Sequence, residues 1–154
     1  MADKQKKTKP LGDFAVNRKA WHDYEILQKL ECGIVLTGTE VKAIRNGGVS
    51  LAGSYASVLS NELYAVEIHI PVYEFGNRFN HEPKRKRKLL VHQKEILSLK
   101  MKSEAKGCTL IPLRLYLKKG KIKLEIGVCR GKALHDKRET LKKKALKRDM
   151  ERGF

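Results

Sequence analysis

The segment from Leu113 to Val128 constrains the fold more than any other part of the sequence. Apolar residues at Leu113, Leu115 and Leu117 alternate with polar ones, and a second alternating run follows the dipeptide Lys119-Gly120. The apolar positions of that second run are Ile122, Leu124, Ile126 and Val128. Two period-two runs joined by a two-residue turn predict a β-hairpin with one buried face and one basic face.

Two further stretches have the patterning of strands. Residues 24–36 predict a long strand with one irregularity near Glu31-Cys32-Gly33. Residues 55–60 and 63–70 flank the turn Ser60-Asn61-Glu62 and predict a second hairpin. Apolar residues recur at every other position of its second strand, so we expect that strand to bury Tyr64, Val66, Ile68 and Ile70.

Two segments between these strands predict helices. Thr37 and Glu40 have the spacing of a capping box and Gly47-Gly48 supplies a stop, so a short helix is expected at about 38–46. Residues 92–105 predict a longer helix that ends before Gly107. The side chains that this helix is expected to turn inward are Ile96, Leu97 and Met101.

Antiparallel strands interrupted by one short and one longer helix predict a mainly β fold with peripheral helices. The expected architecture is an OB-like closed antiparallel β-barrel, a class that suits an oligonucleotide partner, while a β-sandwich stays open on the sequence alone. The chain divides into a basic N-terminal leader at 1–13, the barrel domain at 14–130 and a basic C-terminal tail at 131–154. The tail consists mostly of helix formers with a thin apolar stripe, so we expect it to be disordered, or helical on binding.

The formal net charge of +17 on 154 residues indicates a polyanionic partner, because so large an excess repels itself unless opposite charge is near. Nucleic acid is the usual polyanion, and an anionic membrane is the alternative. No apolar run approaches the roughly 18 residues of a membrane-spanning helix, and no apolar signal region follows the basic N-terminus. We therefore expect a cytoplasmic protein without a membrane partner.

The residues that usually carry catalysis or bind metal are scattered. Cys32, Cys108 and Cys129 form no C-x-x-C pair and are expected to be reduced, small buried side chains. The five histidines lack metal-ligand spacing, and no Walker, G-x-S-x-G or H-E-x-x-H pattern occurs. The sequence therefore predicts no metal, no cofactor and no enzymatic activity.

The run Lys84-Arg85-Lys86-Arg87-Lys88 places five cations in succession. Such a run can contact several phosphates and release their counterions, although a solvated surface loop is the simpler interpretation. The same sign recurs in the hairpin at Lys118, Lys119, Lys121 and Lys123. This recurrence favours polyanion binding.

Aromatic side chains supply candidate stacking platforms for unpaired bases. Tyr64 is in phase with a predicted buried face and is discounted, whereas Tyr55 and His135 lie at less apolar positions. The segment Asn17-Arg18-Lys19-Ala20-Trp21-His22 adds cations and an amide, although Trp21 could simply anchor the N-terminal segment on the barrel. The candidate platforms are Tyr55, Tyr64, Tyr73, Phe75, Tyr116 and His135.

Five stretches, in this order and spacing, resemble the SmpB (small protein B) family over almost the whole chain. They are Asn17–Ala20, Glu31–Lys42, Arg85–Leu90, Leu115–Gly120 and a run from Gly127–Lys132 to His135–Arg138. The resemblance implies an OB-like barrel that binds the tRNA-like domain of tmRNA. The complex would enter the A site of ribosomes stalled on message without a stop codon, with elongation factor Tu and aminoacylated tmRNA as partners in delivery.

The resemblance also implies roles for individual residues. Glu31 would accept a hydrogen bond from a base or sugar, since a carboxylate beside phosphate is repulsive. His135 would stack in the decoding centre, and the following segment would fold in the vacant mRNA channel and sense that it is empty. Ala133 stands where the family commonly has a second Lys, which should weaken this docking slightly. The predicted tmRNA-binding residues are Asn17, Arg18, Lys19, His22, Glu31, Tyr55, Arg85, Arg87, Lys88, Lys118 and Lys119. The predicted ribosome-binding residues are Gly131, Lys132, His135, Asp136, Lys137 and Arg138.

One other function remains open at this stage, and a third is disfavoured. Composition fully permits a structural ribosomal protein that binds ribosomal RNA through its barrel and tail. A small metal-dependent nuclease is disfavoured, because Glu40, Glu67 and Glu82 form no recognisable carboxylate set.

Overall fold

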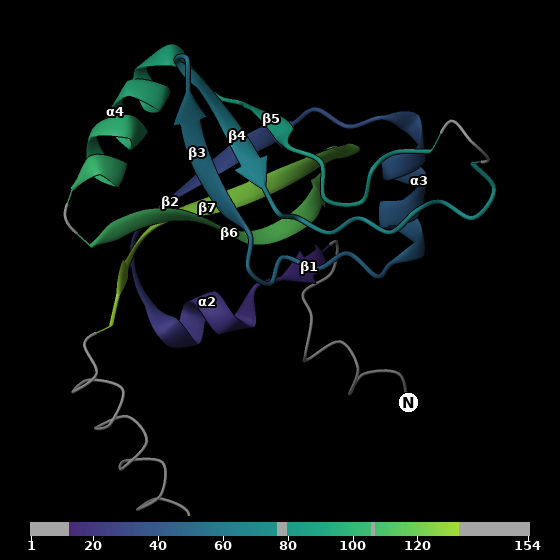
Figure 1. The fold of residues 1–154 in the computed structure, drawn as a ribbon, viewed down its shortest axis with the longest axis horizontal. Helices are drawn as coiled ribbons and strands as arrows, with labels where there is room; N and C mark the ends of the chain where they lie inside the picture. The colour runs from purple at the N-terminus through teal and green to yellow at the C-terminus, as the bar shows by residue number, and fades with distance from the viewer. Residues whose placement is uncertain (1–12, 77–79, 106, 133–154) are drawn as a thin grey trace, which may run out of the picture.

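The strands of the computed structural model, which describes residues 13–76, 80–105 and 107–132, form one antiparallel sheet. Its order is β1-β6-β3-β4-β5-β2-β7, and an additional pairing of β6 with β7 closes six strands into a ring with β1 outside (Figure 1). The predicted closed antiparallel barrel is confirmed. The strands are β1 (Asp13–Val16), β2 (Tyr24–Ile34), β3 (Tyr55–Leu59), β4 (Glu62–Val66), β5 (Arg87–Leu90), β6 (Cys108–Lys118) and β7 (Lys121–Gly131). The helices are α2 (Arg18–Asp23), α3 (Gly38–Asn46) and α4 (Gln93–Glu104).

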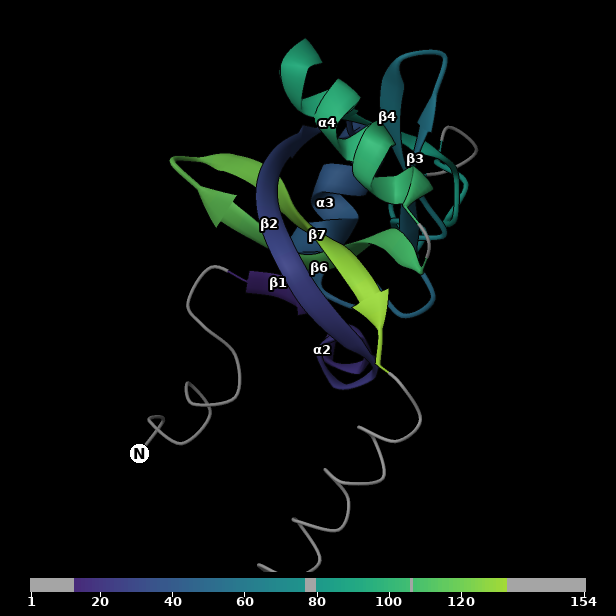
Figure 2. The same cartoon turned by 90° about the vertical axis from the view of Figure 1, so that its left-hand side faces the viewer.

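The helices α3 and α4 lie at opposite ends of the barrel (Figures 1 and 2). α3 forms where the sequence predicts it, because Thr37 and Glu40 make both hydrogen bonds of the capping box. Gly47 ends the helix with a φ of 91°, a backbone conformation that favours glycine. Ala43 and Ile44 of this helix enter the barrel core.

The long helix α4 is also confirmed, but its predicted inward face is partly wrong. Ile96 and Leu99 are buried in the core, whereas Leu97 and Met101 are 50% and 74% exposed. Successive residues of a helix are rotated by about 100° around its axis. A buried stripe through Ile96 and Leu99 therefore turns Leu97 toward solvent.

The predicted hairpin of β6 and β7 is confirmed. Lys119 and Gly120 both have positive φ, 50° and 77°, as a two-residue hairpin turn requires. The register shifts between Pro112 and Arg114, so Leu113 and Leu115 do not share a face as predicted. Leu115 lies in the main core, while Leu113 belongs to a second cluster with Ala20, Ile111 and Cys129. Leu117, expected inside, is 42% exposed near the turn.

The hairpin of β3 and β4 exists, but its predicted buried face is wrong at two positions. Leu63 and Ala65 are fully buried, and Tyr64 is only partly buried. Val66 is likewise only partly buried. Glu67 has a φ of 66°, and beyond this kink Ile68 and Ile70 are buried as predicted.

In β2 the irregularity lies between Ile26 and Gln28 rather than near Glu31-Cys32-Gly33. Ile26 packs on the second cluster, so the shift in register switches β2 from that cluster to the main core. Cys32 and Cys129 are buried as expected, and burial raises the pKa of their thiols to about 12 and about 11. Cys108 is only partly buried.

Replacing Gly127 by Ala is expected to lower the free energy of unfolding by about 1–3 kcal/mol, as overpacking of a core does. A Cβ atom there would lie 2.8 Å from Cδ1 of the fully buried Leu113 and 3.2 Å from Sγ of Cys129. Urea unfolding measures the change. Gly131→Ala is the matched control, since nothing lies within 4 Å of its Cβ position. Equal stabilities of the two variants would contradict this description of the core.

Candidate nucleic-acid interface

One row of side chains crosses the outer face of the barrel. Backbone pairing joins Tyr116 of β6 to Lys123 of β7, Lys123 to Gly33 of β2, and Gly33 to Leu90 of β5. Directly paired residues of antiparallel strands project to the same side of a sheet. The row therefore places an aromatic residue, a cation, a position without a side chain and an apolar side chain next to one another on four strands.

Gly33 leaves a gap in this row. A Cβ atom at this position would lie 3.1 Å from Cβ of Leu90, so the close approach of β2 and β5 favours glycine. Leu90 is 54% exposed. Two hollows of about 380 Å³ and 500 Å³ meet at Gly33, Leu90 and Lys123 and form what we call the outer groove. An apolar surface with a cation beside it can accept an unstacked base and its phosphate.

Glu31 lines the outer groove and contacts two residues of β6. Its carboxylate accepts a hydrogen bond of 2.5 Å from the Tyr116 hydroxyl and lies 3.3 Å from Nζ of Lys118. The hydrogen bond from Tyr116 and the charge of Lys118 lower the pKa of Glu31, while burial and Glu31 raise the pKa of Tyr116. Glu31 is therefore an ionised, exposed acceptor at neutral pH, and it also orients Tyr116 and Lys118.

The five consecutive cations at 84–88 do not share one surface. Lys84, Lys86 and Lys88 are exposed, whereas Arg85 is partly buried and Arg87 is completely buried. Extended backbone turns alternate side chains to opposite sides, so every second residue of the run points inward. The structure therefore corrects the prediction that Arg87 contacts RNA, because its guanidinium cannot reach a phosphate.

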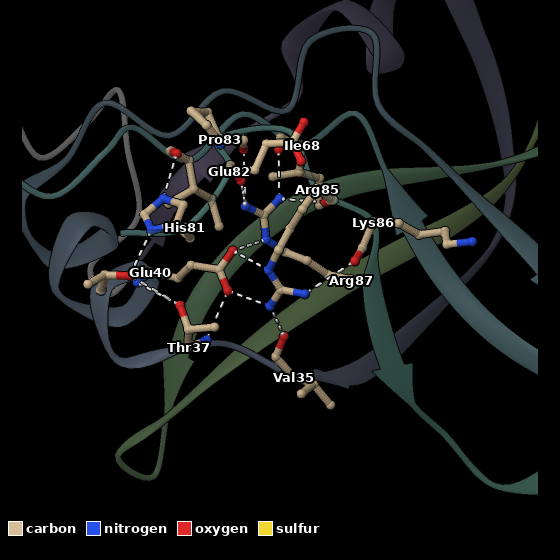
Figure 3. Close-up of polar contacts among 12 residues, drawn as sticks. Val35, Thr37, Glu40, Ile68, His81, Glu82, Pro83, Arg85, Lys86 and Arg87 are labelled. Carbon is tan, nitrogen blue, oxygen red and sulfur yellow. Dashed lines mark hydrogen bonds and ion pairs between the residues drawn. The ribbon is translucent and has the colours of Figure 1, made fainter. Parts of the chain in front are cut away.

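Both arginines point toward the carboxylate of Glu40 on α3 (Figure 3). Arg85 donates to Glu40 at 2.5 Å and 3.1 Å, and Nε of Arg87 donates to one of the same oxygens. Burial alone would raise the pKa of Glu40, but the hydrogen bonds from Arg85, from the Thr37 backbone and from Arg87 lower it. Burial lowers the pKa of Arg87, and the charge of Glu40 opposes that shift. Glu40 and Arg87 therefore remain an ion pair at neutral pH.

Asn17, which was predicted to contact RNA, is a buried structural residue. Its side-chain oxygen accepts a hydrogen bond of 3.1 Å from the backbone N–H of Ala20 and caps α2. Its amide nitrogen donates to the backbone carbonyls of Pro112 at 3.0 Å and Leu51 at 3.3 Å. The polar groups of Asn17 are thus used inside the protein, which corrects the prediction.

The other predicted residues of this segment, Arg18, Lys19 and His22, are exposed on α2. β7 ends beside the same helix, because Gly131 pairs with Tyr24 and the backbone N–H of Lys132 donates to the carbonyl of Asp23 at 3.2 Å. The structure thus brings predicted tmRNA-binding residues close to the first two predicted ribosome-binding residues. His135, Asp136, Lys137 and Arg138 lie outside the described residues.

The aromatic candidates divide between surface and interior. Tyr55 is 44% exposed and lines a hollow of about 400 Å³ with Lys19, which keeps its predicted stacking role open. Tyr116 is buried, with the guanidinium of Arg114 4.1 Å from its ring centre, so its face is not free to stack. Tyr64 is not the core residue that was expected, since Nζ of Lys86 lies 4.9 Å from its ring centre.

Three other rings have neighbours of their own. Tyr73 and Phe75 pack edge to face, with their ring centres 5.6 Å apart, and Phe75 is 72% exposed. Trp21 is half exposed, and Nζ of Lys29 lies 4.8 Å from its ring centre. His135, the remaining candidate platform, lies outside the described residues.

Sequence reasoning missed Gly33, Leu90 and Glu40 as parts of this surface and its support. A lone glycine inside a strand signals close backbone approach, so Gly33 carried a usable signal. Nothing in the sequence signals the roles of Leu90 and Glu40, because these roles depend on residues far away in the chain. Leu90 pairs with Gly33, and Glu40 accepts hydrogen bonds from Arg85 and Arg87.

Within residues 13–76, 80–105 and 107–132, no group of three or more His, Cys, Asp or Glu side chains could hold a metal ion. None of the helices in this part of the chain is long and apolar enough to span a membrane.

A closed, strongly basic β-barrel with an apolar and cationic groove defines a nucleic-acid-binding barrel protein. The comparisons with known proteins then assign the family: a model of the SmpB protein family matches residues 14–154, and the chain belongs to that family. This membership confirms the predicted resemblance and agrees with a binding protein rather than an enzyme.

Relatives of known name support this assignment. An SsrA-binding protein of Staphylococcus haemolyticus is 54% identical and covers 97% of this chain and 96% of its own length. An SsrA-binding protein of Desulfitobacterium hafniense (strain DSM 10664 / DCB-2) is 53% identical over 90% of this chain and 88% of its own. A solved structure described as "tmRNA-SmpB: a journey to the center of the bacterial ribosome" is similar with a TM-score of 0.66 and 48% identity, over 77% of this chain and 84% of that one.

Proposed function

We propose that this protein binds the tRNA-like domain of tmRNA and takes part in trans-translation, the rescue of stalled bacterial ribosomes. Membership in the SmpB family and relatives named SsrA-binding proteins support the partner. The observation that carries the proposal is the outer groove, where Leu90, Gly33 and Lys123 lie beside the ionised acceptor Glu31. Apolar contact, a cation and a hydrogen-bond acceptor are what recognition of an unpaired nucleotide requires.

The other residues that the proposal assigns to tmRNA frame the groove or lie near α2. Lys118 and Lys119 lie at the hairpin turn, and Lys88 is exposed on β5. These cations would contact phosphates and position the RNA, whereas Glu31 would discriminate among RNAs. Arg85 would contribute mainly through its hydrogen bonds to Glu40 and not through a contact with RNA. Arg18, Lys19, His22 and Tyr55 form the second part of the surface.

The proposal extends to the ribosome and to delivery. The barrel domain at 14–130 would hold tmRNA, and the tail at 131–154 would enter the decoding centre and the empty mRNA channel of a stalled ribosome. Gly131, Lys132, His135, Asp136, Lys137 and Arg138 would make the ribosome contacts. Elongation factor Tu with aminoacylated tmRNA would be the delivery partner, and the cytoplasm would be the place of action.

Glu31→Ala is expected to reduce the preference for the tRNA-like domain more than it reduces affinity for RNA in general. The change removes an acceptor for a base or sugar and also a negative charge that repels phosphate. Parallel titrations with the tRNA-like domain and a plain duplex measure the ratio of the two affinities. Glu25→Ala is the matched control, because Glu25 is likewise an exposed carboxylate that accepts a hydrogen bond from a surface cation, Arg130, and it does not line the outer groove. An equal loss on both RNAs would refute the discriminating role.

Reconstituted translation tests the proposed function as a whole. A system that lacks its own rescue factor translates a message without a stop codon, with tmRNA supplied. Adding this protein should produce tagged polypeptide, which a mass shift on a gel reveals. If no tag appears although tmRNA is aminoacylated, the proposal fails. A structural ribosomal protein would instead remain on salt-washed ribosomes in equal stoichiometry.

A further inference from the structure

The segment 82–88 presents its three lysines on the outside of the barrel. Nζ of Lys84 lies 3.6 Å from the carboxylate of Glu67, and Nζ of Lys88 lies 3.1 Å from that of Glu62. Lys86 lies over the ring of Tyr64, which pairs with Lys88 across β4 and β5. We call Lys84, Lys86 and Lys88 the lysine surface. Each of these lysines thus has a neighbour beside its ammonium nitrogen, although all three side chains are exposed.

All the N–H donors of the Arg87 guanidinium have acceptors inside the protein. Besides the bond from Nε to Glu40, it donates to the carbonyls of Ile68 at 2.8 Å, Pro83 at 3.0 Å and Arg85 at 3.1 Å. A longer contact of 3.5 Å reaches the carbonyl of Glu82. A guanidinium has five N–H donors, so none remains for a phosphate. Three of the four carbonyls belong to the segment that carries the lysine surface.

Glu40 connects this segment to α3. One carboxylate oxygen accepts from the backbone N–H of Thr37 at 2.9 Å, which fixes the side chain within the capping box. The same carboxylate accepts from Arg85, whose guanidinium also donates to the carbonyls of Val35 at 3.2 Å and Lys86 at 3.3 Å. Hydrogen bonds of Arg85 and Arg87 therefore connect the backbone of the lysine surface to α3 and to the barrel at several points (Figure 3).

We propose that Glu40, Arg85 and Arg87 form a buried positioning cluster that sets the selectivity of the lysine surface for a folded RNA. This inference rests on the proposed function, since it names a further part of the same interface and how that part is held. Lysines fixed in one arrangement match the phosphates of one RNA shape. Lysines on a loose segment still neutralise phosphates, but they do so equally well on any RNA.

Charge-preserving variants separate positioning from charge. Arg87→Lys keeps the cation but loses the planar fork that reaches three backbone carbonyls and Glu40 at once. Arg85→Lys makes the same change at the partly exposed partner and leaves the buried pair of Glu40 and Arg87 in place. Lys86→Met is the contrasting variant, because it removes one cation of the lysine surface and leaves the cluster intact. Urea unfolding establishes that each full-length variant is folded.

The measurement is the affinity of each variant for the tRNA-like domain of tmRNA and for a plain RNA duplex, over a series of salt concentrations. Arg87→Lys should reduce the ratio of the two affinities about 10-fold or more, a change of about 1.4 kcal/mol. Its salt dependence on either RNA should match that of the unmodified protein. Lys86→Met should reduce the slope of log affinity against log salt concentration by about one unit. It should largely retain the ratio of the affinities for the two RNAs.

A loss of folded protein alone lowers both affinities by one factor and leaves their ratio unchanged. The proposal is therefore overturned if folded Arg87→Lys keeps the ratio of the unmodified protein, or if it loses slope as Lys86→Met does. If Arg87→Lys does not fold, Arg85→Lys decides by the same two criteria. If the unmodified protein shows no preference between the RNAs, the proposed function itself fails, a result distinct from a preference that survives in the variants.

Discussion

Glu40→Gln is expected to lower the free energy of unfolding by about 3–5 kcal/mol, which is the range for removing one partner of a buried ion pair. The side chains of Glu40 and Arg87 are both fully buried, so the variant leaves a guanidinium charge without compensation away from water. Glutamine can still accept the hydrogen bond from the Thr37 backbone, and the capping box of α3 tolerates it. The loss therefore reports on the ion pair rather than on the helix cap. Urea unfolding at neutral pH gives the value.

Two controls make this expectation specific. Glu62→Gln makes the same chemical change at an exposed ion pair with Lys88, and it should leave stability nearly unchanged. The pH dependence of the free energy of unfolding is the second control. The folded-state pKa of Glu40 is lowered, so its contribution is present above the ordinary Glu value of about 4.3 and is lost as pH falls through the folded pKa. The difference between the unmodified protein and Glu40→Gln should narrow in that acid range, and a difference independent of pH would contradict the ion-pair explanation.

Cutting the chain after Gly131 is expected to abolish tagging of stalled products and to preserve the preference for the tRNA-like domain of tmRNA. β7 ends at Gly131, so the barrel, the outer groove and the lysine surface are all retained. The removed segment holds His135 and all the other residues proposed to contact the ribosome except Gly131. The reconstituted translation system measures tagging, and a binding titration measures the preference.

Ala133→Lys in the full-length chain is the companion variant. It supplies the second cation that the resemblance to the family implies at this position, and it should tag at least as efficiently as the unmodified protein. Normal tagging by the truncated chain would show that the tail does not sense the mRNA channel. Loss of tmRNA binding on truncation would show that the tail belongs to the RNA interface.

The features predicted correctly from sequence are those whose signals are local. The turn at Lys119-Gly120 and the capping box of Thr37 and Glu40 are decided by adjacent residues, so the hairpin of β6 and β7 and the helix α3 follow directly. The kink at Glu67 and the register shift near Pro112 depend on how whole strands pair. No pattern of alternation shows them in advance, and side chains beyond each irregularity change face.

The candidate site was predicted only in part, because some of its residues are also placed by contacts between distant parts of the chain. Glu31 and the exposed lysines could be named from the sequence, but a run of five cations does not reveal which of them is buried. That distinction depends on Glu40, which lies 47 residues before Arg87 and meets it only in the folded barrel. Leu90 and Gly33 likewise become part of one groove through the pairing of β2 with β5.

The most direct test of the proposed function is a titration of the unmodified protein at two salt concentrations. The RNAs are the tRNA-like domain of tmRNA, an elongator tRNA and a plain duplex. We expect the tRNA-like domain to bind about 100-fold more tightly or better, an advantage near 3 kcal/mol at roughly 1.4 kcal/mol per decade, and to keep its lead as salt rises. If all three RNAs bind alike and weaken together with salt, only phosphate attraction is present, and a structural ribosomal protein becomes the better description.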